Sequence, residues 1–255
     1  MSLLNVEVAK SYEAMSERAA DLILAELKRR PDLLLCLSAG ATPTDTYKLL
    51  AKHGGRQPGL FRKLRLLKVD EWGGLSPNSP ASCEGDLRLK LLKPLRFGPA
   101  RCEGFRPDAA NPRHECERIT KWLADNGPID ICILGLGRNG HIAMNEPSHA
   151  LLPHAHEARL TDSSLKHPML KALKRKPRFG FTLGMAEILR SRKILLLVNG
   201  QHKRAVLKRL LEPRITTRFP ASFLWLHPDA TVLCDRDAAS DFKSLGTPSE
   251  LSSVL

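Results

Sequence analysis

The sequence contains no apolar run that approaches the roughly 20 residues that a membrane-spanning helix needs. Its N-terminal stretch, MSLLNVEVAKSYEAM, also lacks a basic segment followed by a long apolar one, so it does not resemble a secretory signal peptide. These two absences favour a protein of the cytoplasm that has no membrane partner.

Cysteine pairs and acidic residues are also scarce. The six cysteines include no CxxC pair, and Cys36, Cys132 and Cys234 lie within apolar, strand-like runs. In a long chain without a secretory signal, this pattern indicates free buried thiols rather than disulfides. Lys and Arg number 40 against 27 Asp and Glu, and a net charge of +13 suits an anionic partner. Nucleic acid, a membrane surface and a phosphorylated metabolite all satisfy that criterion.

Apolar runs of strand length alternate with helical patterns along the chain, and 255 residues can form one large domain. Strands are predicted at residues 3–8, 33–37, 64–69, 129–134, 179–183, 194–198, 222–226 and 231–234. Helices are predicted at residues 11–30, from Thr42, and at residues 79–92, 111–127 and 200–211. This alternation predicts an α/β fold: one doubly wound, Rossmann-like domain over residues 1–255 with a mostly parallel sheet. Residues 148–178 are irregular and basic, so we expect them to form a flap over the site.

The stretch at residues 129–147, IDICILGLGRNGHIAMNEP, joins a buried-strand pattern to glycines and titratable side chains. Its first half is apolar except for Asp130, as in strands that are buried on both faces of a parallel sheet. Three glycines, an imidazole and a carboxylate follow: Gly135, Gly137, Gly140, His141 and Glu146. Open α/β sheets carry their chemistry at such strand ends, so this stretch is the predicted centre of the site.

Two other predicted strands end in small or acidic residues. After residues 33–37 comes SAGATP, where Thr42 is expected to cap a helix that has a proline at its first position. Free N–H groups and the positive end of a helix dipole would make an anion site there, although many such turns bind nothing. After residues 64–69 come Asp70 and Glu71, which at the tip of a buried strand favour a function over a solvated turn.

The central stretch admits two other interpretations. GLGRNG satisfies the G-x-G-x-x-G pattern, but Pro147 lies where the dinucleotide-binding helix would run, and no strand follows at the distance that would supply the ribose-binding acid. Zinc could use His141 with Glu146, or the histidines of SHALLPHAH, but neither set has a helical histidine pair or a group of cysteines. We therefore expect no metal and no other cofactor.

Taken together, SAGATP, VDEW and GLGRNGHIAMNEP, each after a predicted strand and in this order, resemble the glucosamine-6-phosphate deaminase family, whose relatives include 6-phosphogluconolactonases. The resemblance covers about residue 33 to about residue 235. NGHIAMNEP is specific for the amino-sugar phosphate branch, because lactonases usually lack the NEP element. DEWGGL and PASFLWLH look more like galactosamine-6-phosphate isomerases than glucosamine-6-phosphate deaminases, which tend to have DEY.

The resemblance implies two groups of site residues. Those that bind the substrate and its 6-phosphate are Gly40, Ala41, Thr42, Gly137 and Lys203. Those that take part in catalysis are Asp70, His141, Glu146 and Asn139. Asp70 matches the base that moves a proton between C2 and C1, and His141, partnered by Glu146, matches the residue that assists pyranose ring opening. An aldose-to-ketose shift needs such a carboxylate, and ring opening needs an acid and base that work near neutral pH. Without the resemblance, Lys203 would be taken for a solvated helix lysine.

The chain departs from the family pattern at three places. Asn139 stands where the deaminases usually have Asp, so His141 is expected to depend more on Glu146. The segment after NEP carries His156 and Ala158 near the positions of basic residues in activator-responsive hexamers, so activation by that route is not expected. The phosphate-binding arginine of the family's flap has no clean counterpart, and the candidates to replace it are Lys166 and His167.

The function expected from the sequence is therefore a deaminating isomerase. It would convert an amino-sugar 6-phosphate, galactosamine rather than glucosamine, to the ketose 6-phosphate and ammonia. The partner is a phosphorylated amino sugar and not nucleic acid or membrane, and the chain could act as a monomer or a homo-oligomer. The rivals are 6-phosphogluconolactonase, disfavoured by the NEP element, and a non-catalytic sugar-phosphate sensor, for which no DNA-binding module is expected in this chain.

Overall fold

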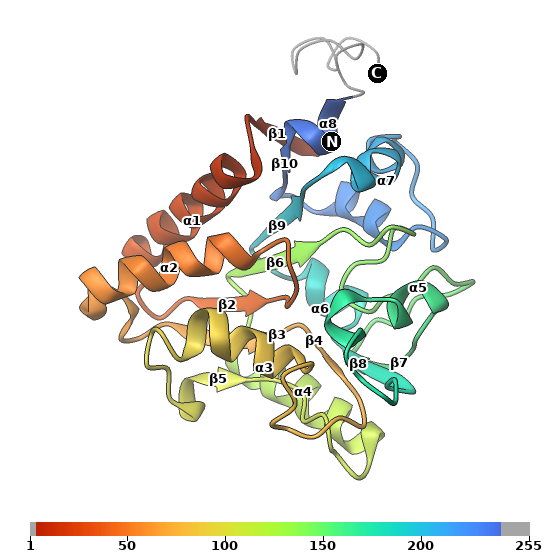
Figure 1. Cartoon of the computed structure of the whole chain (residues 1–255), viewed down its shortest axis with the longest axis horizontal. Coiled ribbons are helices and arrows are strands. Elements are labelled where there is room, and N and C mark those ends of the chain that lie inside the picture. Colours follow the sequence, from red (N-terminus) through yellow and green to blue (C-terminus); the bar gives the residue numbers. More distant parts are fainter. Residues whose placement is uncertain (1–3, 241–255) are drawn as a thin grey trace.

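The computed structural model describes residues 4–240, and a parallel sheet made from the apolar runs lies at its centre (Figure 1). Seven strands form it within this range: β1 (Asn5–Ala9), β2 (Leu34–Leu37), β3 (Arg65–Lys68), β5 (Cys102–Glu103), β6 (Ile131–Gly135), β9 (Lys193–Val198) and β10 (Ala230–Asp235). Their order is β1-β10-β9-β6-β2-β3-β5, and every neighbouring pair is parallel. The predicted α/β class with a mostly parallel sheet is confirmed.

Helices cover both faces of this sheet because successive residues of the central strands point to opposite sides. Leu35, Leu37 and Ile133 pack with the helices of one face: α1 (Tyr12–Arg29), α2 (Thr44–Arg56), η1 (Pro58–Phe61), α3 (Cys83–Leu87) and the π-helical turn η2 (Arg88–Leu92). Leu34 and Cys132 pack with those of the other: α4 (Pro112–Asn126), α6 (Met185–Leu189), α7 (Arg204–Leu210), η6 (Pro220–Leu226) and α8 (Arg236–Ala239). These runs read as continuously apolar because both of their faces are buried.

Local capping signals predicted several helix ends correctly. Ser11 accepts the N–H of Ala14 at 3.3 Å and caps α1, as expected from the sequence. Asn111 caps α4 in the same way, and the helix ends before Gly127. The predicted strand at residues 222–226 is wrong, because this apolar run forms the 3-10 helix η6, which starts at Pro220. Proline suits the first position of such a turn and removes a donor that a strand would need.

A second sheet that the sequence did not predict lies beside the ends of the parallel strands (Figure 1). It is antiparallel, in the order β4 (Asp70–Trp72), β8 (Phe179–Thr182) and β7 (His156–Arg159). Asp70 and Glu71 follow β3 closely, as expected, but they also begin a strand that was not predicted, in which Asp70 pairs with Thr182. The carboxylates therefore lie where the two sheets meet.

Residues 148–178 contain β7, α5 (Asp162–Leu165) and η4 (Pro168–Leu170), and that they move as a flap stays a prediction. The remaining short elements are η3 (Pro99–Arg101) and η5 (Gln201–Lys203). All six cysteines are free, and five of them are buried. Among residues 4–240, no helix is both long and apolar enough to cross a membrane.

Candidate active site

The loop at residues 38–43, here called the anion loop, joins β2 to α2. Gly40 has φ +115°, and its N–H donates to Asp86 Oδ2 at 3.0 Å. Gly40 was expected to offer backbone groups to a phosphate, but its N–H is already bonded. The N–H groups of Ala41 and Thr42 have no hydrogen-bond partner within the described residues. They lie before the N-terminus of α2, where an anion is favoured.

Thr42 is not the helix cap that the sequence predicted. Pro43 occupies the N-cap position of α2, and the Thr42 hydroxyl instead donates to Asn199 Oδ1 at 2.8 Å. Asn199 directly follows β9, so this bond ties the anion loop to the end of a strand on the far side of β6. Tertiary contact outweighed the local capping preference here, because the hydroxyl has a polar partner within reach.

Lys203 extends from the end of η5 toward the same sheet edge. Its ammonium donates to the backbone oxygen of Leu136, which lies between Gly135 and Gly137 in the central stretch. Burial, reinforced by the charge of Arg138, lowers the pKa of Lys203 to about 8. A half-buried lysine held in this way is not the solvated helix lysine that base rates would suggest.

His141, Asn139 and Glu146 form one polar cluster after β6. His141 Nδ1 lies 3.4 Å from Glu146 Oε2, an ion-pair distance without the alignment of a hydrogen bond. The Asn139 side-chain amide donates to the same oxygen at 2.7 Å, and its Oδ1 accepts the backbone N–H of His141 at 3.2 Å. The Thr161 hydroxyl donates to Oε1 at 3.2 Å, and the Ser164 hydroxyl does so more closely. Burial acts to raise the pKa of Glu146, but His141 and these donors outweigh it and lower that pKa to about 2.

Gly137 contacts the imidazole of this cluster. A Cβ placed on Gly137 would lie 2.4 Å from the His141 ring, closer than real side chains pack. The Gly137 N–H also donates to the His141 carbonyl at 2.9 Å. That Gly137 binds substrate stays a prediction; in the structure its lack of a side chain leaves room for the His141 ring.

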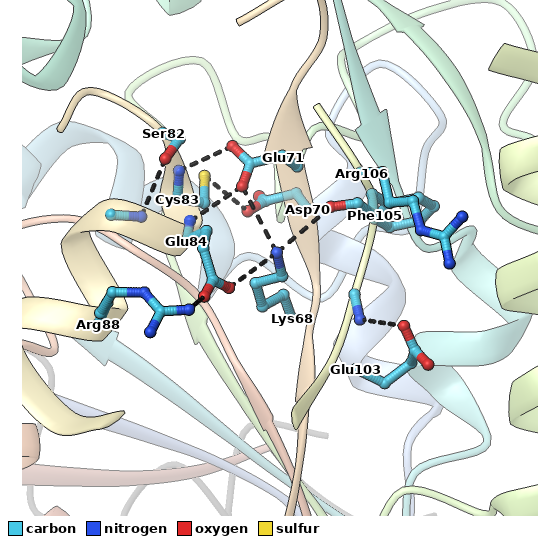
Figure 2. Close-up of polar contacts among 12 residues, drawn as sticks. Lys68, Asp70, Glu71, Ser82, Cys83, Glu84, Arg88, Glu103, Phe105 and Arg106 are labelled. Atoms are coloured by element: carbon cyan, nitrogen blue, oxygen red, sulfur yellow. Dashed lines mark hydrogen bonds and ion pairs between the residues drawn. The ribbon is translucent and has the colours of Figure 1, made fainter. Parts of the chain in front are cut away.

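Asp70 is buried, and its carboxylate has fewer hydrogen-bond donors around it than that of Glu146. Its side chain contacts the thiol of Cys83, whose Sγ lies 3.6 Å from Oδ1 (Figure 2). Burial, reinforced by the charge of Glu71, raises the pKa of Asp70 to about 7. The Cys83 contact and the charge of Lys68 oppose this rise without cancelling it. A carboxylate with a pKa near 7 can both take and return a proton at neutral pH.

The Glu71 carboxylate, unlike that of Asp70, is bonded to backbone N–H groups. It is fully buried, and its carboxylate accepts the N–H groups of Trp72, Cys83 and Glu84 at 2.7 to 2.9 Å, so it binds the N-terminus of α3 (Figure 2). Lys68 lies behind it, 3.7 Å from Glu71 and 3.0 Å from Glu84. These contacts fix strand β4 against α3 and thereby place Asp70 beside the Cys83 thiol.

Thr182 links the two carboxylate regions. It pairs with Asp70 across β4 and β8, and its hydroxyl accepts the backbone N–H of Met144 at 3.2 Å. The Asn145 side-chain amide donates to the same hydroxyl at 3.4 Å and to the Leu183 carbonyl at 2.9 Å. The residue that precedes Glu146 is therefore anchored on the strand that pairs with Asp70.

His167 projects from residues 148–178 into the site. Its Cε1 and Nε2 each lie 3.8 Å from where a Cβ on Gly40 would be, and its ring centroid is 5.7 Å from that of Trp72. His167 Nδ1 accepts the N–H of Met169 at 3.3 Å, so Nε2 carries the proton of the neutral ring. Burial, reinforced by the nearby His141 and Lys203, lowers the pKa of His167 and keeps its imidazole neutral near pH 7.

Sequence reasoning did not single out several residues that complete this site: Cys83, Asp86, Lys90, Thr161, Ser164 and Thr182. The pattern Ser82-Cys83 inside the predicted helix at residues 79–92 could have placed Cys83 in a first helical turn, because serine is a good N-cap. The others have no sequence signal, since each acts through a partner that is distant along the chain.

Comparison with known proteins agrees with the motifs. Residues 7–233 match the family described as glucosamine-6-phosphate isomerases/6-phosphogluconolactonase. AgaI of Escherichia coli (strain K12), named provisionally as a deaminase, is 39% identical over 222 residues, which cover 87% of this chain and 88% of AgaI. A glucosamine-6-phosphate deaminase of Geobacillus sp. (strain WCH70) is 36% identical over 236 residues, covering 91% and 93%.

Solved structures give the same result. A monomeric glucosamine-6-phosphate deaminase superposes with a TM-score of 0.87 at 33% identity, covering 93% of this chain and 99% of that one. The 6-phosphogluconolactonase from Trypanosoma brucei, at 20% identity, superposes with a TM-score of 0.74 over 93% and 98% and shares the fold. The chain belongs to the family of glucosamine-6-phosphate isomerases and 6-phosphogluconolactonases. The resemblance predicted from the sequence is confirmed.

Proposed function

We propose that this chain is a deaminating isomerase that converts galactosamine 6-phosphate to tagatose 6-phosphate and ammonia. One observation carries the proposal: two carboxylates occupy linked regions of the site, and their surroundings separate their pKa values, to about 7 for Asp70 and about 2 for Glu146. Such a separation assigns one carboxylate to proton transfer and the other to a fixed negative charge. The named deaminases among its relatives support the same reaction class.

The chemistry proceeds in three steps. The His141 imidazole, held by Glu146, moves a proton between the ring oxygen and the C1 hydroxyl and so opens the pyranose. Asp70 then removes the C2 proton while the C1 carbonyl oxygen takes up a proton, which gives an enolamine. Asp70 returns its proton to C1 as the nitrogen gives up one proton, which leaves a ketimine at C2. Water adds to C2 of the ketimine, and the C2–N bond breaks to release ammonia and leave the ketose. Every proton in this sequence returns to the sugar or to the departing nitrogen.

The phosphate is held at the other end of the substrate. The free N–H groups of Ala41 and Thr42 and the Lys203 ammonium supply its donors. His167 adds its Nε2–H and takes the place of the arginine that the family carries in this segment, since its ring lies over Gly40. Lys166, the other candidate, is exposed and makes no contact with the site.

Parallel turnover assays test the proposal. Ammonia release should be measured with galactosamine 6-phosphate and glucosamine 6-phosphate, and hydrolysis should be measured with 6-phosphogluconolactone. We expect a higher kcat/KM for the galacto epimer, as favoured by DEWGGL and PASFLWLH. An equal or reversed ratio would overturn the epimer assignment alone. Lactone hydrolysis without ammonia release, or binding without turnover, would overturn the reaction class.

A variant of Lys203 tests the phosphate site separately. Lys203→Ala should mainly raise KM, because a contact with the non-reacting phosphate is equally strong in the ground and transition states. Lys208→Ala on the exposed side of α7 is the matched control and should leave KM unchanged. An unaltered KM in folded Lys203→Ala would remove Lys203 from the phosphate site.

A further inference from the structure

We propose that Asp86 and Lys90 are positioning residues that hold the anion loop in its binding form and balance the charge beside the bound phosphate. The two residues lie one helical turn apart, at the junction of α3 and η2. The inference deepens the proposed function, on which it rests only by taking the free N–H groups of Ala41 and Thr42 as the phosphate site.

The ion pair holds both polar backbone groups of one glycine. Asp86 Oδ2 accepts the N–H of Gly40 at 3.0 Å, and Lys90 Nζ donates to the carbonyl oxygen of Gly40 at 2.9 Å. Lys90 Nζ lies 2.5 Å from Asp86 Oδ1, and the side chains of Asp86 and Lys90 are only 14% and 15% exposed. Gly40 has φ +115°, a conformation that side-chain-bearing residues rarely adopt. Two charge-assisted hydrogen bonds therefore stabilise the positive-φ conformation of Gly40 near the start of the anion loop.

Further hydrogen bonds engage two backbone carbonyls of the anion loop. The Gly40 carbonyl also accepts from the Thr44 hydroxyl at 2.9 Å, and the Ala41 carbonyl accepts from the Tyr12 hydroxyl at 3.1 Å. These two carbonyls are therefore engaged, whereas the N–H groups of Ala41 and Thr42 have no partner within the described residues. An anion loop gains affinity when it is preorganised in this way, because less ordering is required on binding.

The same pair controls charge near the ligand. An unpaired Asp86 carboxylate bonded to the anion loop would repel a phosphate, and the Lys90 ammonium neutralises it at contact distance. The charges of both Asp86 and Lys90 reach His167, which lies over the loop, so the pair is within electrostatic range of the ligand site. Removing the lysine alone should therefore harm binding more than removing both charges.

The experiment is a double-mutant cycle with Lys90→Met, Asp86→Asn and the double variant. Inorganic phosphate is titrated into each full-length protein by calorimetry, and KM, kcat and Tm are recorded for each. We expect Lys90→Met to weaken phosphate binding and raise KM by roughly tenfold, with kcat within about twofold of the wild type. The double variant should recover part of that loss. Asp86→Asn should have the smallest effect, since its amide oxygen still accepts the Gly40 N–H.

A matched control is Lys121→Met, which breaks an exposed i, i+4 pair with Asp125 on α4 and should leave phosphate binding unchanged. Unchanged phosphate affinity in folded Lys90→Met, or a double variant that binds phosphate no better than Lys90→Met, would overturn the inference. The two proposals fail separately: if phosphate affinity depends on Asp86 and Lys90 as expected but the wild type releases no ammonia from an amino-sugar phosphate, only the proposed function is overturned.

Discussion

The surroundings of Asp70 and the loop around Glu146 have opposite effects on the pKa values of these two carboxylates. Asp70 has one weak thiol donor and a neighbouring carboxylate, and the pKa of Asp70 rises to about 7. The Glu146 loop offers an amide, two hydroxyls and an imidazole, and the pKa of Glu146 falls to about 2 despite burial. Burial is common to both, so the hydrogen-bond donors and the charged neighbours decide which carboxylate stays ionised.

The largest effect is expected when the proton carrier of this pair is removed. Asp70→Asn keeps the size of the side chain but loses the basic lone pair, so kcat should fall by roughly 10²- to 10⁴-fold with little change in KM. Solvent deuterium at C1 of the ketose or C2 of recovered substrate reports the proton transfer directly. Turnover and exchange near the wild-type rate would assign the proton to another group.

Glu71→Gln is the comparison for that variant. The Glu71 carboxylate accepts hydrogen bonds from three backbone N–H groups. In Glu71→Gln one carboxylate oxygen becomes an NH2 group, which cannot accept these bonds, so Tm should fall. The folded protein should nevertheless lose much less kcat than Asp70→Asn. A larger loss of kcat at Glu71 would show that the two neighbouring carboxylates have been interchanged.

Glu146→Gln removes the negative charge of the second carboxylate. The Gln amide nitrogen would meet the Asn139 donor or the two hydroxyl donors, so the cluster that orients His141 would rearrange, and kcat should fall by roughly 10²-fold. Ser164→Ala, which removes one donor and keeps the carboxylate, should change kcat only a few-fold. Equal kcat values for the two variants would mean that the charge of Glu146 is unimportant.

A pH profile of kcat/KM in the wild type tests the difference between the pKa values of Asp70 and Glu146 without a mutation. Asp70 acts as a base in its ionised form, so kcat/KM should be low below its pKa and rise as pH increases through about 7, until Lys203, with a pKa of about 8, loses its charge. Glu146, with a pKa of about 2, stays ionised and should add no inflection between pH 5 and pH 8. A profile that is flat across pH 6 to 8 would contradict the assignment of Asp70.

The smallest expected effect is at Cys83. Burial raises the pKa of the Cys83 thiol well above its usual range, so it stays protonated and donates to Asp70. Cys83→Ala removes this donor and should shift the acid limb of kcat/KM upward by about a few tenths of a pH unit. Cys116→Ala, at a buried cysteine of α4, is the matched control. A shift of equal size in both variants would indicate a general loss of packing instead.

Short-range features of the fold were predictable because their causes are local. The Ser11 and Asn111 caps, the proline and glycine boundaries and the apolar runs of β2, β6, β9 and β10 each depend on neighbouring residues alone. The three strand-end motifs likewise located Asp70, His141 and Glu146 at one edge of the sheet, since parallel strands end together. Their catalytic roles stay predictions.

Only the tertiary structure decided how those side chains are surrounded. Strand β4 exists because Asp70–Trp72 pairs with β8, more than a hundred residues away, and no local pattern encodes that partner. The Asp86–Lys90 contact with Gly40 and the donors to Glu146 also join segments that are distant in sequence. A carboxylate's pKa depends on burial and on donors within a few ångströms, so the sequence determined which groups the site contains and the fold determined their ionisation.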